Sequence, residues 1–170
     1  MSDELAIPEQ ARADETPWQR WWRALQERRG DRASLRRCRS VLDVALEPAF
    51  HDLLKRLGSR LKEVDRDRVA AVAAILAHVE KDEPAWSIAE LMARPKGDKP
   101  VVSDARFRRL LRLESPDELM HELVRVIGML GGEAPVAPLA SDLARWGDPI
   151  RKRWALAYYE KAEPLLQSTR

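Results

Sequence analysis

The residues of this sequence best suited to a chemical task are its arginines, and the task that suits them is holding phosphate groups. The chain has 170 residues, and 23 of its 30 basic residues are Arg. A guanidinium presents a planar fork of N–H donors that fits a phosphate bidentately, and it loses water more readily than an ammonium does. Because the formal net charge is only +2, the positions of these residues say more than their number.

The basic residues concentrate in three segments. Residues 17–39 contain eight Arg against two acids, a net charge of +6, whereas residues 1–16 have a net charge of −4. The other two segments are 106–112, with four Arg, and 151–153, with the sequence RKR. The last of these begins a predicted helix, where the helix dipole disfavours cations, so a partner is expected to supply negative charge. Such local patches are compatible with a polyanion-binding protein of mild overall pI.

In the first segment the arginines form a ridge on one predicted helix, which begins at Asp31. Arg32, Arg36 and Arg39 recur at i, i+4 and i+7, and therefore share one face. Arg37 lies at the flank of this face. An ordinary solvated face alternates charge signs so that i,i+4 ion pairs form, but here the acid is confined to the start of the helix. The charge pattern favours phosphate binding over a solvated surface.

The second segment places four arginines on one predicted helix, namely Arg106, Arg108, Arg109 and Arg112. Four guanidinium groups cannot all point one way, so some are either surface charge or ion-pair partners of Asp104 or Glu114. On a later predicted helix, Arg125 lies one turn from Glu122. For Arg125 an intrahelical ion pair is the simpler interpretation.

The elements that must position these residues are predicted to be helices. Apolar residues recur with helical spacing almost everywhere, and no segment alternates with period two. Thr, Ser or Asp caps precede the apolar runs, and Gly30 is expected to end the first helix. We predict an all-α fold of about nine helices in two packed bundles. Its divisions are an acidic flexible N-terminus (1–16), an N-terminal bundle (17–93), a linker or loop (94–102) and a C-terminal bundle (103–170).

The sequence lacks the motifs of an enzyme or a cofactor site. Its three His are isolated on different predicted helices, and no phosphate-binding glycine loop or G-x-S-x-G elbow occurs. The single cysteine, Cys38, excludes a disulfide framework and a cysteine-built zinc site, and we interpret it as a buried small residue rather than an activated thiol. We expect no cofactor, no metal and no catalytic residue, and a site assembled from distant residues stays open.

Two further features of the sequence predict where in the cell the protein is located. The sequence contains no apolar run approaching the roughly 20 residues of a membrane helix. Its acidic start lacks the basic-then-apolar order of an export signal. We therefore expect a cytoplasmic protein without membrane contact.

The order of several segments resembles the CasB family, the small subunit of the type I-E CRISPR Cascade complex. The resemblance runs from about Trp18 to Tyr159 and is carried by GDRASLRRC, PAFHDLL, SDARFRRLLR, SPDELMHELVRVIGML and DLARWGDPIRKRWALAYY. The order and spacing of these segments are more specific than any one of them. The resemblance implies an all-α, two-bundle protein without enzymatic activity, present as two copies beside other Cascade subunits.

The same resemblance implies a role in antiviral defence, which is to hold an R-loop open. Basic residues of such subunits contact the displaced DNA strand and the target strand that pairs with crRNA, without regard to sequence. The resemblance selects Arg37, Arg66, Arg106, Arg125, Arg151, Lys152 and Arg153. The charge pattern adds Arg32, Arg36 and Arg109. The alternative is a structural spacer whose arginines bind acidic faces of neighbouring proteins and do not touch nucleic acid.

Overall fold

The described chain is almost entirely helical, as the sequence predicts. The computed structural model describes residues 14–168, so the predicted acidic segment 1–16 lies outside them except for its last three residues. Within residues 14–168 the chain forms ten α-helices, one 3-10 helix and four strands of two residues each. In this part of the chain no helix has the length and apolar character needed to cross a membrane.

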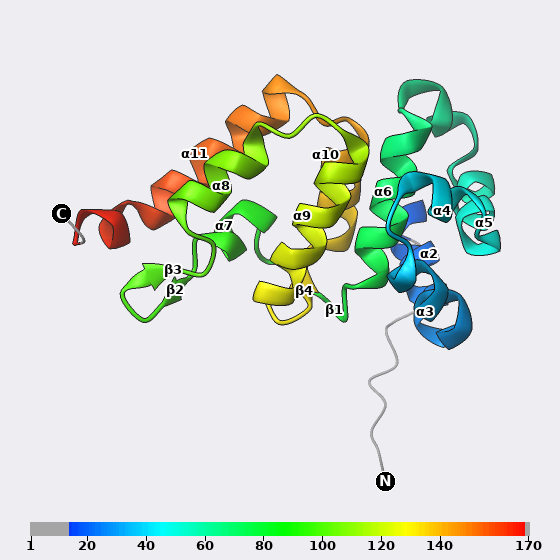
Figure 1. The fold of residues 1–170 in the computed structure, drawn as a ribbon, viewed down its shortest axis with the longest axis horizontal. Helices are drawn as coiled ribbons and strands as arrows, with labels where there is room; N and C mark the ends of the chain where they lie inside the picture. The colour runs from blue at the N-terminus through cyan, green and yellow to red at the C-terminus, as the bar shows by residue number, and fades with distance from the viewer. Residues whose placement is uncertain (1–13, 169–170) are drawn as a thin grey trace, which may run out of the picture.

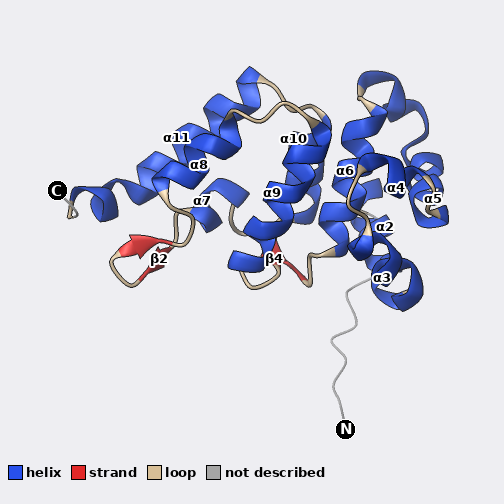
Figure 2. Cartoon of the chain, viewed as in Figure 1, coloured by secondary structure: helices blue, strands red, loops and turns tan. Residues whose placement is uncertain are grey.

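The elements follow one another as shown in Figures 1 and 2. The first group is α2 (Pro17–Glu27), α3 (Arg29–Arg37), α4 (Val41–Ala45), α5 (Pro48–Leu57), η1 (Gly58–Glu63) and α6 (Arg66–Ala77). The second group is α7 (Ile88–Met92), α8 (Asp104–Leu111), α9 (Pro116–Met129), α10 (Val136–Ala144) and α11 (Asp148–Gln167). Strand β1 (Lys81–Asp82) pairs in parallel with β4 (Glu133–Ala134), and β2 (Pro95–Lys96) pairs antiparallel with β3 (Lys99–Pro100).

Side-chain caps determine where the helices begin. At α2, the hydroxyl of Thr16 accepts from the backbone N–H of Gln19, whose side chain accepts from the N–H of Thr16 in return. One boundary differs from the prediction. Gly30 lies inside α3 and does not end the first helix, because the chain leaves helical geometry two residues earlier, at Arg28, where ψ is 73°.

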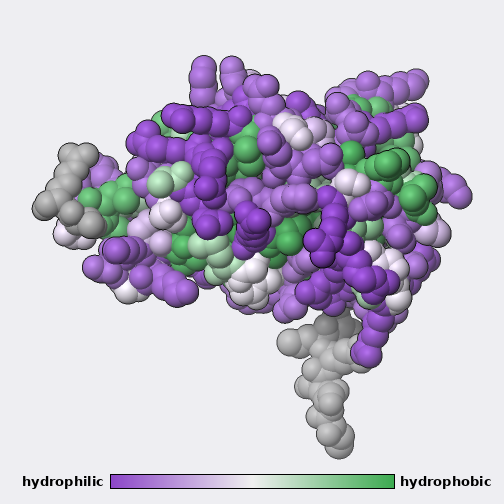
Figure 3. Space-filling view, viewed as in Figure 1, coloured by the Kyte–Doolittle hydropathy of each residue, from purple (hydrophilic) through white to green (hydrophobic). Residues whose placement is uncertain are grey.

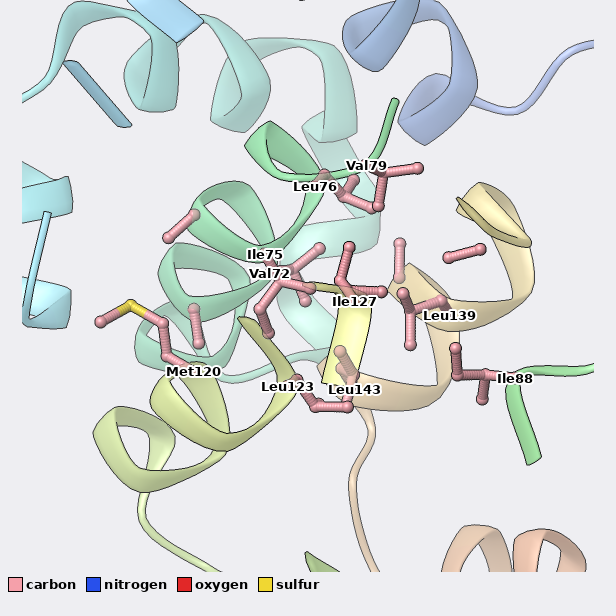
Figure 4. Close-up of a cluster of buried hydrophobic side chains, with 14 of the residues drawn as sticks. Val72, Ile75, Leu76, Val79, Ile88, Met120, Leu123, Ile127, Leu139 and Leu143 are labelled. Atoms are coloured by element: carbon pink, nitrogen blue, oxygen red, sulfur yellow. The ribbon is translucent and has the colours of Figure 1, made fainter. Parts of the chain in front are cut away.

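The core is built around α6. All nine residues from Val69 to Ala77 are buried, and five of them are alanines. Their small side chains let α3, α4, α9 and α10 pack against one helix. Figure 4 shows the resulting cluster, in which Val72 and Ile75 of α6 lie together with Leu123 and Ile127 of α9 and Leu139 of α10. Helices from both predicted bundles thus contribute to this core, and the division into two bundles stays a prediction.

Indole N–H groups tie α2 to its neighbours inside the core. Trp21 donates to the carbonyl of Ala49 at 2.9 Å, which joins α2 to α5. Trp22 donates to the carbonyl of Val79 at 3.1 Å, just beyond the end of α6. Because a buried carbonyl without a donor is costly, these bonds fix α2 as well as satisfying the backbone.

Residues 94–102, expected to be a linker or mobile loop, contain the β2–β3 hairpin. The hairpin continues into Val102, which is fully buried. The hydroxyl of Tyr158, on α11, donates to the carbonyl of Val102 at 2.6 Å. Strands of two residues have no measurable period, so the apolar pattern could not reveal them.

Replacing Tyr158 by Phe should lower the free energy of unfolding by about 1–3 kcal/mol, because the buried carbonyl of Val102 loses its donor. Leu156→Ala on the same helix is the control. Leu156 is 74% exposed, so its replacement should change stability by about 0.5 kcal/mol at most. Urea unfolding of both variants measures the difference, and an unchanged stability of Tyr158→Phe would contradict the anchoring role.

Candidate nucleic-acid interface

A groove between α3 and α9 gathers basic side chains from helices that are far apart in the sequence. We call it the α3–α9 groove; its volume is about 230 Å³, and it is lined by Arg36, Cys38, Arg39, His78, Met120, His121, Val124 and Arg125. Its three arginines are exposed. Among residues 14–168, the guanidinium groups of Arg36 and Arg39 have no ion-pair partner. The groove therefore presents cations that the described chain does not neutralise.

Backbone contacts hold the two walls of the groove in place. On α9, the Nε2–H of His121 donates to the carbonyl of Arg39. On the side of α6, the Nε–H of Arg32 donates to the carbonyl of Ala77 at 3.1 Å. Arg32, one of the predicted phosphate-binding residues, thus uses this donor to hold α3 against the end of α6.

A buried carboxylate organises the arginines beside the groove. Among residues 14–168, Glu122 is the one charged residue that is buried, with 7% of its side chain exposed. Its carboxylate oxygens lie 3.1 Å from Arg106, 3.4 Å from Arg109 and 3.6 Å from Arg125. We call these four residues the Glu122 cluster. One negative charge faces three positive charges, so the cluster keeps a net charge of +2.

The Glu122 cluster leaves N–H donors free on its outer side. Each guanidinium carries five N–H groups, and the side chains of Arg109 and Arg125 are 61% and 69% exposed. Because Arg125 also lines the α3–α9 groove, groove and cluster form one continuous surface. Figure 3 shows hydrophilic residues gathered over α3 and beside it.

The sequence analysis named the arginines of the Glu122 cluster as candidates but did not identify Glu122, the carboxylate that they share. Arg125 does form the intrahelical pair with Glu122 that its spacing suggested. Arg106 and Arg109, from α8, share the same carboxylate. The available signal was that Glu122 follows Leu119 by three residues, on the apolar side of α9, where a charge needs partners.

Arg108, in the second basic segment, was expected to be either a surface charge or an ion-pair partner of Asp104 or Glu114, and it pairs with Asp104. Its Nε lies 3.0 Å from a carboxylate oxygen of Asp104 one turn earlier on α8. Its guanidinium also lies over the ring of Tyr159, 5.5 Å from the ring centroid. Glu114, the other suggested partner, lies 3.8 Å from Arg151 on α11.

Arg36 and Arg37 lie on different sides of α3. Arg37 donates to the hydroxyl of Ser34 at 3.2 Å and lines a second hollow, which also contains the carboxylates of Asp43 and Glu47. The α3–α9 groove contains Arg36 and Arg39 but not Arg32. Arg39 does not share a helix face with Arg36 as predicted, because α3 ends at Arg37 and Cys38 is extended. Arg37, which the resemblance selects, lies outside it.

The remaining candidates lie at another edge of the molecule. In Figure 1, α6 and α11 begin at the upper edge and α3 lies at the lower edge. Arg66 and Lys152 are exposed there. Arg151 is 20% exposed and donates to a backbone carbonyl before α9 at 3.1 Å, and Arg153 is ion-paired with Asp142. The structure therefore does not bring all ten candidates together in one groove.

The electrostatic field of the groove acts on His78, which caps the end of α6. Burial lowers the pKa of His78 below its usual value of 6.5, and the positive charges of Arg36 and Arg32 lower it further. An additional proton on His78, which lines the groove, is therefore disfavoured.

The fold is shared with a chain of a Cascade structure and with CasB. A chain of E. coli Cascade bound to a PAM-containing dsDNA target has a TM-score of 0.66 and 19% sequence identity, and the match covers 88% of this chain and 99% of that chain. CasB from Thermus thermophilus has a TM-score of 0.59 and 22% identity, with 86% of this chain and 99% of that chain covered. At these identities the likeness establishes the fold: this is an all-helical protein built like CasB.

The family itself is established by the sequence. The profile of the CRISPR-associated protein Cse2 family matches residues 31–159. This chain therefore belongs to the Cse2 family, which confirms the CasB-type resemblance. The matched range contains every candidate residue from Arg32 to Arg153. No curated protein matches the sequence.

Glu122→Gln should lower the free energy of unfolding by about 1–3 kcal/mol, because three arginines lose the charge that binds them. Glu118→Gln is the matched control, since Glu118 is exposed one turn earlier on α9. Its replacement should cost about 0.5 kcal/mol at most. Urea unfolding at pH 7 compares the two, and equal effects would show that the Glu122 cluster does not contribute to stability.

The lowered pKa of His78 predicts a pH dependence of stability. The unfolded chain binds a proton at this site more readily than the folded chain does, so the contribution of His78 is complete above pH 6.5 and is lost as pH falls through the folded pKa. An NMR titration should find the pKa of His78 below 6.5. Arg36→Gln should raise that pKa, because it removes one of the repelling charges. A pKa unchanged by Arg36→Gln would contradict the proposed field.

Proposed function

We propose that this protein is a non-catalytic, nucleic-acid-binding subunit of type I-E Cascade that stabilises the R-loop during antiviral defence. The observation that carries the proposal is the continuous basic surface of the α3–α9 groove and the Glu122 cluster. Its cations come from α3, from Arg39 just beyond α3, from α8 and from α9, and Arg36 and Arg39 have no ion pair within residues 14–168. The displaced and target strands present rows of phosphates that match such a surface.

Phosphate contacts suffice for this role. Opening duplex DNA against a guide RNA is nearly balanced in base-pairing energy, so a few backbone contacts decide its direction. Each guanidinium bound to a phosphate of the displaced strand makes re-annealing less favourable. Contacts to phosphate carry no sequence information, and the side chains that line the groove include no Asn or Gln to read base edges.

The proposal assigns no catalytic step to this surface. Burial raises the pKa of the Cys38 thiol, and the charges of Glu47 and Asp43 raise it further, so the thiol stays protonated and weakly nucleophilic at neutral pH. Among residues 14–168, no three His, Cys, Asp or Glu side chains gather where they could hold a metal ion. Cutting of DNA would then belong to another subunit.

The proposed partners are the other Cascade subunits, a second copy of this chain, and crRNA-guided target DNA with its displaced strand. The E. coli chain of the same fold belongs to a Cascade bound to dsDNA, which supports this set. The competing hypothesis is a spacer subunit that contacts protein alone. The spacer hypothesis is favoured by the arginines that already have partners within the fold, such as Arg151, which donates to a backbone carbonyl, and Arg153, which is ion-paired.

Fluorescence anisotropy with a labelled single-stranded oligonucleotide over a range of salt concentrations tests the proposal. The double variant Arg36→Gln/Arg125→Gln should bind more weakly, and its log–log salt slope should be shallower by about 1.4, because about 0.7 is lost for each phosphate contact. Arg20→Gln/Arg60→Gln is the matched control. These two arginines line a different hollow, beside Asp14 and Glu15.

Two results would favour the spacer hypothesis. One is an unmodified protein that does not bind the oligonucleotide. The other is an equal loss of binding in both double variants, because a general loss of charge would then explain the effect. Retained assembly with the other Cascade subunits, together with a shorter R-loop lifetime in the groove variant, would separate DNA contact from assembly.

A further inference from the structure

The β2–β3 hairpin projects from the helices at the side of the molecule away from α3 (Figures 1 and 2). Its strands are joined by a two-residue turn, Gly97 and Asp98. Gly97 has φ +68°, a value that side chains with a Cβ rarely adopt. Lys96 and Lys99, on either side of this turn, are exposed.

The base of the hairpin is rigidly anchored. The N–H of Val101 donates to the carbonyl of Arg94 at 2.9 Å, and the N–H of Val102 donates to that of Met92 at 2.9 Å. Tyr158 fixes the same segment from α11 through the carbonyl of Val102. The tip is therefore presented in a fixed position, which reduces the entropy lost when it binds a partner.

The tip carries two like charges that face each other. Lys96 and Lys99 are directly opposite in the register of β2 and β3, so their side chains lie on the same face. Like charges in such a pair are destabilising. Neither ammonium has an ion-pair partner among residues 14–168, whereas Arg94 at the base is paired with Glu133 at 3.3 Å. The tip thus holds two adjacent cations that no carboxylate of residues 14–168 neutralises.

The chemistry of the hairpin favours an anionic backbone over a protein partner. Pro95 and Pro100, opposite each other in the ladder, have no N–H to offer, so another strand could not pair there in the usual way. The exposed residues of the tip include no aromatic or large apolar side chain, and lysine is depleted from protein–protein interfaces. Binding of a phosphate backbone requires neither strand pairing nor apolar contacts.

We infer that the β2–β3 hairpin is a second nucleic-acid contact, separate from the α3–α9 groove, in which Lys96 and Lys99 hold the phosphate backbone of a DNA strand. This inference rests on the proposed function. Asp98, in the turn, works against the contact because its carboxylate repels phosphate. The hairpin and the groove lie at different sides of the chain, so the hairpin adds a second point of attachment along a strand.

The test is single-stranded DNA binding by the full chain, measured as a function of salt. Lys96→Gln/Lys99→Gln should weaken binding and make the log–log salt slope shallower by about 1.4. Asp98→Asn should strengthen binding. Lys55→Gln/Lys62→Gln removes two exposed lysines from α5 and η1 and should leave the slope unchanged. All the substituted side chains are exposed, and an unchanged melting temperature confirms that each variant is folded.

The outcomes separate this inference from the proposed function. If the groove variant Arg36→Gln/Arg125→Gln weakens binding but the hairpin variant does not, the inference is wrong and the proposed function stands. If the unmodified chain does not bind DNA at all, both fail. A hairpin variant that binds DNA normally but no longer joins the other Cascade subunits would assign the hairpin to an acidic protein surface and overturn the inference.

Discussion

The basic surface of this protein depends on the compensation of one buried carboxylate. A carboxylate buried as Glu122 is needs cations beside it, and they come from α8 as Arg106 and Arg109 and from α9 as Arg125. The same guanidinium groups that stabilise the buried charge turn their remaining donors toward solvent. Since three cations share one anion, the cluster is held together and still keeps a net positive charge. Packing and the proposed function therefore use the same atoms.

The width of the α3–α9 groove is a property of the core. Both α3 and α9 pack on α6, whose five buried alanines determine how closely the two helices approach. Their final positions depend on backbone carbonyls, because Arg32 holds α3 at Ala77 and His121 holds Arg39, two residues beyond the end of α3, from the side of α9. Larger side chains on α6 would move the walls apart, even though none of its buried alanines lines the groove.

The sequence predicted what depends on local chemistry and missed what depends on tertiary placement. Helical spacing and caps such as Thr16 predicted the all-α fold. The predicted helix face of Arg32, Arg36 and Arg39 is wrong for Arg39, because α3 ends at Arg37 and the chain is extended at Cys38. The bend at Arg28 was missed, because a non-glycine residue that leaves helical geometry has no local signature. The hairpin was missed because it is too short to show a period. The role of Glu122 was missed because two of its three partners lie on another helix.

The start of α11 shows why counting charges cannot identify a binding surface. Arg151, Lys152 and Arg153 are equivalent in the sequence, and the helix dipole suggested that a partner must neutralise them. The fold supplies much of that compensation itself, through a backbone carbonyl and Asp148 for Arg151 and through Asp142 for Arg153. A cation already satisfied in this way has less to gain from a phosphate. The cations that matter most for a polyanion are those left unpaired, and Arg36 and Arg39 of the α3–α9 groove meet this condition within residues 14–168, whereas Arg151 and Arg153 of the more conspicuous RKR segment do not.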